Sequence, residues 1–113
     1  MARQSCECMT PSQPHPEFEH VWLGKDTTQG RFGRVTIETC KECNRIWLCY
    51  EVEYPAFSKS GRWYRGIVSP SVARTVTPES AVAILEGLDW YLYGGSYFES
   101  RGARGSGTVY VGL

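Results

Sequence analysis

The cysteines are the residues of this 113-residue chain whose type and spacing most clearly predict a chemistry. Cys6 and Cys8 are separated by one residue, Cys40 and Cys43 by two, and 31 residues lie between the pairs. Two close thiol pairs far apart in sequence are typical of a zinc site in which four thiolates form a tetrahedron, each pair supplying one edge. We therefore expect these four cysteines to bind zinc. The fifth cysteine, Cys49, is expected to pack as a small apolar residue.

The sequence around the second pair fits a metal-binding turn. In Cys40-Lys41-Glu42-Cys43-Asn44 the residue after the second cysteine needs a positive φ if backbone amides are to turn toward the sulfurs. Asparagine tolerates that conformation better than most residues other than glycine. We also expect Lys41 and Arg45 to offset part of the negative charge of the thiolates.

At this point the chain resembles the zinc-ribbon class. The resemblance covers Cys6 to about Tyr54 and departs at the first pair, where Cys-x-Cys replaces the more usual Cys-x-x-Cys. It implies two cysteine knuckles on adjacent β-hairpins that hold one structural zinc ion. In that interpretation the metal fastens a proline-rich arm, residues 1–16, to the body of the protein.

Other interpretations of these residues stay open. His15 and His20 are competing metal ligands, although a lone histidine on a strand beside Phe18 and Trp22 is more typical of a hydrogen-bonded structural residue. The thiols could also be inert and buried, or could form a disulfide in an exported protein. A metal-dependent enzyme with His20 as a ligand is a further alternative, but no His-x-Glu motif begins at His20 and no His-Glu-x-x-His motif occurs to place a general base. We expect a closed structural site.

A second feature combines cations with aromatic rings. Lys59, Arg62, Trp63 and Arg65 lie close together in sequence and could contact phosphates and stack on bases. Alternatively, Trp63 and Ile67 belong to the core and the arginines form a solvated rim. The 12 Lys and Arg residues equal the 12 Asp and Glu residues, so the formal net charge is zero and supplies no long-range attraction for a polyanion.

The elements that must position these residues are mainly strands. Alternation of apolar and polar residues predicts antiparallel strands over 17–23, 31–39, 46–54 and 62–68, with a short one over 108–111. In the third, Ile46, Leu48, Tyr50, Val52 and Tyr54 should face the core.

In the C-terminal half the spacing of apolar residues changes from every second residue to every third or fourth. Thr77 before Pro78 predicts a helix start, and an apolar stripe over 81–92 carries the helix to Gly94-Gly95. Residues 100–107 are predicted to be a flexible Gly/Arg loop. The expected fold is a single α+β domain, 1–113, with an antiparallel sheet of four or five strands, one helix and the zinc-ribbon-like site at its N-terminal end.

Composition limits the classes of function that we expect for this chain. No run approaches the ~18 apolar residues of a membrane helix and the first residues form no apolar signal core, so we expect a cytoplasmic protein without a membrane partner. The 15 aromatic residues, four of them Trp, exceed what a core of this size requires, and exposed Trp and Tyr anchor protein interfaces. We expect a non-enzymatic, zinc-containing module that binds a protein partner, such as a small bacterial adaptor or a toxin-neutralising protein. Nucleic-acid binding is the alternative.

Overall fold

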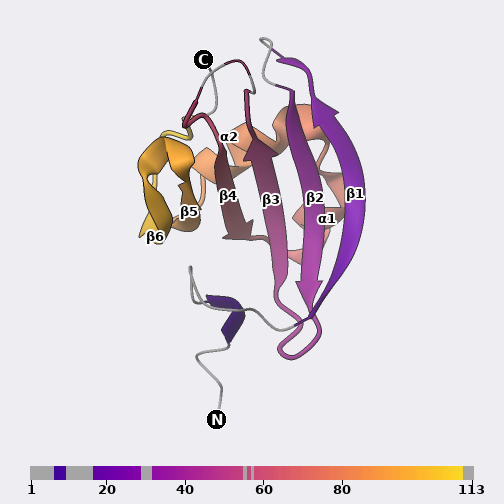
Figure 1. Ribbon diagram of the computed structural model, residues 1–113. Coiled ribbons are helices and arrows are strands. Elements are labelled where there is room, and N and C mark those ends of the chain that lie inside the picture. Colours follow the sequence, from indigo (N-terminus) through magenta and orange to yellow (C-terminus); the bar gives the residue numbers. More distant parts are fainter. Residues whose placement is uncertain (1–6, 10–16, 29–31, 55, 57, 111–113) are drawn as a thin grey trace.

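The structure is a computed structural model that describes residues 7–9, 17–28, 32–54, 56 and 58–110. Its centre is one antiparallel sheet of six strands that follow one another in sequence order (Figure 1). The strands are β1 (Phe18–Asp26), β2 (Gly33–Cys40), β3 (Ile46–Val52), β4 (Arg62–Ile67), β5 (Tyr91–Gly95) and β6 (Ser100–Gly105). The fold is α+β, as predicted, but it has six strands where the sequence predicts four or five. The four strands predicted in the N-terminal part correspond to β1–β4.

Two short helices, α1 (Pro70–Thr75) and α2 (Ala81–Glu86), lie on one face of the sheet (Figure 1), which we call the helical face. The period-two pattern of β3 is confirmed, since its predicted core residues face this side. The buried core here includes Val35, Ile37, Leu48, Tyr50, Val52, Tyr54, Tyr64, Leu85 and Tyr91, with Ile46 packed against it. This cluster holds the helices to the sheet.

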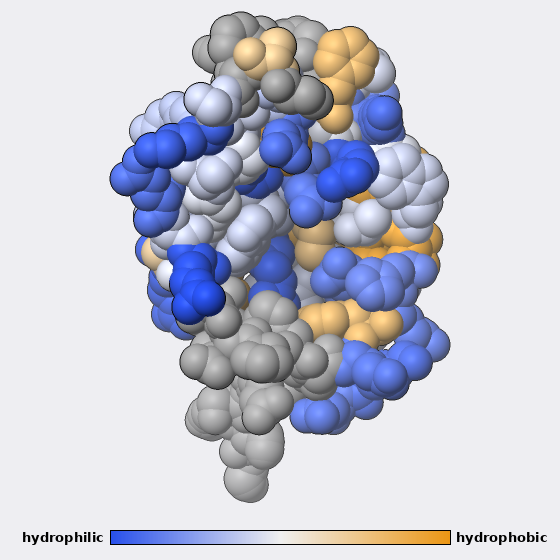
Figure 2. All heavy atoms as spheres, in the orientation of Figure 1, coloured by the Kyte–Doolittle hydropathy of each residue, from blue (hydrophilic) through white to orange (hydrophobic). Residues whose placement is uncertain are grey.

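We call the opposite side of the sheet the cysteine face. It carries a second, smaller buried cluster of Cys8, Cys40, Trp47 and Leu92, against which Trp63 and Ile67 pack. Cys8 belongs to a short 3-10 helix, η1 (Glu7–Met9), at one end of the sheet (Figure 1). Figure 2 shows that hydrophilic and apolar side chains are mixed on the surface seen in this orientation.

The C-terminal half differs from the predicted single long helix. Thr77 caps as predicted, and its side chain accepts a hydrogen bond from the backbone N–H of Ser80 at 3.2 Å. A 3-10 turn, η3 (Pro78–Ser80), then leads into α2, which ends at Glu86 with Gly87 as its C-cap. Glycine disfavours helix continuation, and the aromatic-rich segment beyond it pairs with β4 as β5. The prediction that this segment continues the helix was wrong.

Three further elements of the C-terminal half differ from what the sequence predicts. Residues 100–105, predicted to lie in a flexible loop, form β6 and pair with β5. The first helix, α1, was not predicted, although Ser69 caps it and Pro70 occupies its first turn. Residues 108–110 are not in a strand; the N–H of Tyr110 instead donates to the hydroxyl of Tyr64 at 2.8 Å. The strand character of β6 comes from its pairing with β5, which its glycine-rich composition does not reveal.

A buried carboxylate secures the β1–β2 hairpin. Asp26 is fully buried at the end of β1 and accepts a hydrogen bond from the hydroxyl of Tyr50 on β3 at 2.7 Å, and another from the backbone N–H of Thr28 at 3.0 Å. The Tyr50 ring passes over Gly33, where an added Cβ would lie 2.1 Å from the ring. The Tyr50 hydroxyl is therefore one of the donors that hold this carboxylate, together with the backbone N–H and the hydroxyl of Thr28.

Replacing Tyr50 with Phe should destabilise the protein. Tyr50→Phe keeps the ring but removes one donor from a buried carboxylate, which costs about 1–3 kcal/mol in free energy of unfolding. Denaturant-induced unfolding measures this loss. Tyr97→Phe is the control, because Tyr97 is 45% exposed and should tolerate the loss of its hydroxyl. Equal stability of Tyr50→Phe and the unmodified protein would contradict the prediction.

Candidate metal centre

Three of the predicted ligands meet in space. The sulfur atoms of Cys8, Cys40 and Cys43 all lie within 4.8 Å of one another, and those of Cys8 and Cys43 are 3.6 Å apart. A disulfide requires about 2.05 Å between sulfurs. A tetrahedral site with metal–sulfur bonds of about 2.3 Å has edges of about 3.8 Å. The Cys8–Cys43 distance therefore matches one edge of such a site rather than a disulfide, and the three sulfurs together could hold a metal ion.

The turn between β2 and β3 positions two of the sulfurs. Cys40 ends β2, and its N–H donates to the carbonyl of Arg45 at 2.9 Å. The N–H of Asn44 donates to the carbonyl of Cys40 at 2.8 Å, and Asn44 has a φ of 66°. The predicted positive φ is thus confirmed. The tight turn holds Cys43 close to Cys40.

The third sulfur comes from a segment far away in sequence. Cys8 lies in η1 and is fully buried, as is Cys40, whereas Cys43 is partly exposed. Cys6 lies outside the described residues. The structure thus brings together three of the four predicted cysteines.

A cation that the sequence analysis did not link to this group, Arg65, contacts the segment that carries one of its sulfurs. Lys41 is exposed, and its ammonium lies 3.8 Å from a carboxylate oxygen of Glu17. Arg65 of β4 is instead 6% exposed, and its Nη2 donates to the carbonyl oxygen of Cys8 at 3.0 Å. Burial lowers the pKa of Arg65, and the nearby acidic groups, which include the Cys8 and Cys40 thiols, raise it. No local sequence pattern reveals this placement, because it depends on the pairing of Arg65 on β4 with Cys49 on β3.

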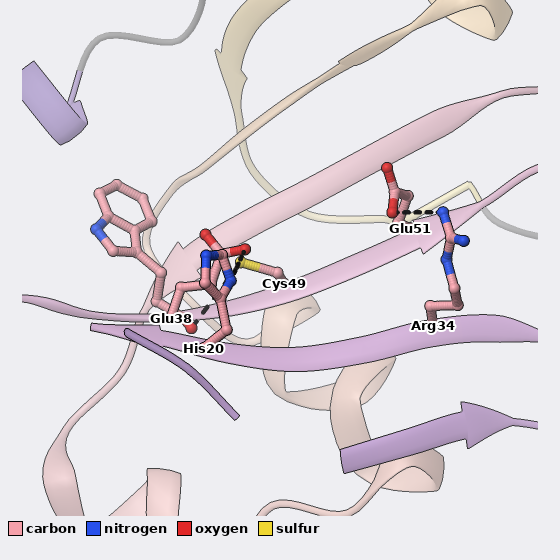
Figure 3. A network of polar contacts seen from close by, with 6 residues as sticks. His20, Arg34, Glu38, Cys49 and Glu51 are labelled. Carbon is pink, nitrogen blue, oxygen red and sulfur yellow. Dashed lines mark hydrogen bonds and ion pairs between the residues drawn. The ribbon is translucent and has the colours of Figure 1, made fainter. Parts of the chain in front are cut away.

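The histidines do not join the three sulfurs. His20 is exposed on β1, with Nδ1 3.3 Å from a carboxylate oxygen of Glu38 (Figure 3). It is not part of the three-cysteine group of Cys8, Cys40 and Cys43. His15 lies outside the described residues. Cys49 lies beside Glu38 on the same face (Figure 3), and burial, followed by the charge of Glu38, raises the pKa of its thiol.

The residues proposed for nucleic-acid contact do not share one exposed surface. Arg62 is 4% exposed on the helical face, with its guanidinium carbon 3.7 Å from the centroid of the Tyr97 ring and Nη1 donating to the carbonyl of Tyr110 at 3.0 Å. Arg65 points to the opposite face, and Trp63 is half-buried. Lys59 is exposed and forms an ion pair with Glu99. The expectation of a solvated arginine rim was wrong, because both guanidinium groups are buried against aromatic rings.

Comparisons with known proteins do not assign this chain to a family. Comparison found no matching family model, no matching curated protein and no matching solved structure. Within the described part of the chain, none of the helices combines the length and the apolar character that crossing a membrane requires. Function must therefore be argued from the geometry of the site.

The thiol of Cys49 should react more slowly than that of Cys43, although both side chains are partly exposed. The thiolate is the reactive form, and burial of the Cys49 sulfur, followed by the charge of Glu38, raises the pKa of that thiol. In the folded, metal-free protein at about pH 8, iodoacetamide should modify Cys43 first. Peptide mass spectrometry measures both rates, and the unfolded chain, in which they should converge, is the control. Faster modification of Cys49 in the folded state would contradict this assignment.

Proposed function

We propose that this protein is a non-enzymatic binding module in which a structural zinc ion fastens the N-terminal segment to the sheet. Cys8, Cys40 and Cys43 are three of the ligands, and Cys6 is the fourth. The observation that carries the proposal is the convergence of three sulfurs from two segments more than thirty residues apart. Thiolate groups at this spacing match the ligand set of structural zinc sites.

The surroundings favour a structural over a catalytic role. A catalytic zinc ion keeps an open position and a base nearby. Among the described residues, no histidine or carboxylate joins Cys8, Cys40 and Cys43 within 4.8 Å, and two of the three sulfurs are fully buried. The metal would instead link η1 to the β2–β3 turn, so that its binding free energy becomes folding free energy.

Zinc is proposed on the donor type and on the resemblance to zinc ribbons. Thiolate ligands also suit Cu(I) and iron–sulfur clusters. The knuckle at Cys40–Cys43, with its left-handed Asn44, supports the zinc-ribbon comparison in the second half of the site. The identity of the metal is thus the first measurement to make.

The second half of the proposal is a protein partner that contacts β1. Val21 and Trp22 are 55% and 56% exposed on this nine-residue strand, which forms one edge of the sheet. Exposed tryptophan and an edge strand are both features of protein-binding surfaces. Burial of Arg62 and Arg65 removes the main support for the nucleic-acid alternative.

Metal content tests the proposal of a structural zinc ion. Purified protein should contain about one zinc ion per chain, the stoichiometry of a closed four-ligand site. Serine substitutions of Cys6, Cys8, Cys40 and Cys43, made one at a time, should each lower zinc content and melting temperature, because each removes one thiolate. Elemental analysis and thermal unfolding with and without a chelator measure both.

The matched control is Cys49→Ser, which removes a thiol that lies outside the three-cysteine group. It should keep its zinc. If the purified protein contains no metal and its melting temperature does not change when zinc is added, the structural-zinc proposal is contradicted. A metal other than zinc at the same stoichiometry would correct its identity.

Site-specific crosslinking tests the partner. A photoreactive residue at Glu19, exposed on β1, should give one discrete protein adduct in cells that make the protein, and Trp22→Ala should abolish it. The same probe at Ser71, exposed on α1, is the control. Equal adducts from both positions, or an adduct sensitive to nuclease, would contradict a protein partner on β1.

A further inference from the structure

One buried cation adjoins the three-cysteine group. Arg65 lies on β4 opposite Cys49 of β3, and its side chain is on the cysteine face. Its Nη2 donates to the carbonyl oxygen of Cys8, the ligand that comes from η1. Burial lowers the pKa of Arg65, and the acidic groups that raise it are, largest first, Cys49, Glu38, Cys8 and Cys40. A single side chain therefore contacts the segment that carries one ligand and also interacts electrostatically with the thiols of two ligands.

The guanidinium is held in a fixed place. Its central carbon lies 4.1 Å from the centroid of the Trp47 ring and 5.5 Å from that of Phe18, two aromatic side chains of the same face. Trp47 is fully buried. A planar cation stacked in this way keeps its orientation, which a flexible lysine would not do as well.

The charge balance of a filled site requires such a cation. Zinc bound by three thiolates has a net charge of −1, and zinc bound by four has −2. Because Cys8 and Cys40 are fully buried, this excess negative charge is removed from water, and it is costly unless a positive charge lies close by. Lys41 is exposed and directed to Glu17. Arginine keeps its charge in proteins, so Arg65 is suited to this role.

We propose that Arg65 is the counter-cation of the metal centre and a positioning residue for it. Its charge stabilises the metal–thiolate group, and its hydrogen bond to the Cys8 carbonyl holds that segment where the sulfur can reach the metal. This inference rests on the proposed function, because it assumes that the cysteines bind zinc. It assigns to the site a residue 22 positions beyond the last cysteine ligand.

Two substitutions separate the charge from the hydrogen bond. Arg65→Gln removes the charge but keeps a side-chain N–H donor, whereas Arg65→Lys keeps the charge but loses the planar fork. The matched control is Arg62→Gln. Arg62 is equally buried on the same strand, stacks on Tyr97 and donates to a backbone carbonyl, that of Tyr110, but it lies on the helical face.

The measurement is the zinc dissociation constant, obtained by competition with a chelator of known affinity. We expect Arg65→Gln to weaken zinc binding by about 10- to 100-fold, the range typical of residues that support metal ligands. Arg65→Lys should weaken it less, because the charge remains. Arg62→Gln should bind zinc as the unmodified protein does.

A second measurement separates this role from a purely structural one. The free energy of unfolding is compared with and without zinc for each variant. Loss of a structural contact alone would lower both values equally, whereas the proposed role requires the zinc-induced gain to shrink in Arg65→Gln and not in Arg62→Gln. An unchanged zinc affinity, or an unchanged zinc-induced gain, in Arg65→Gln would overturn the role of Arg65. Failure of the unmodified protein to bind zinc would instead overturn the proposed function.

Discussion

The register of the central strands is the constraint on which both faces of the sheet depend. Successive side chains of a strand point to opposite faces of the sheet. A shift of one residue in the register would therefore move every side chain of that strand to the other face. In the observed register, Val35, Tyr50 and Tyr64 are aligned across β2, β3 and β4 on the helical face. The neighbouring row aligns Thr36, Cys49 and Arg65 on the cysteine face. The same pairing thus builds the main core and places an arginine beside the sulfurs.

The sequence predicts the parts of this fold that have a strong local signal. The alternation over 46–54 predicts which residues face the main core, and the Thr77-Pro78 cap marks the start of the 3-10 turn that leads into α2. Residues 91–95 carry apolar residues compatible with either a helix or a strand, and β6, in which Ser100, Gly102 and Gly105 are three of six residues, resembles a loop in composition. Their strand character comes from pairing with β4 and with each other, which is a non-local property.

The candidate metal centre also has features that the sequence predicts and features that it does not. The close pair Cys40 and Cys43 and the conformation of Asn44 are readable from five consecutive residues, and the structure agrees with both. The role of Arg65 is not readable, because its neighbours come from other strands and from η1. From the sequence alone, an arginine that follows Trp63 and Tyr64 is expected at the surface. In the structure the Arg65 guanidinium is buried against the rings of Trp47 and Phe18, which belong to other strands.

Strand β4 also joins the two ends of the described chain. Arg65 binds the carbonyl of Cys8 on one face, and Arg62, three residues earlier, binds the carbonyl of Tyr110 on the other. Each end therefore opens only if a guanidinium–carbonyl bond to the same strand breaks. Fraying at either end is coupled to the middle of the sheet, which should make unfolding more cooperative than is usual for a small domain whose end segments lie outside the strands.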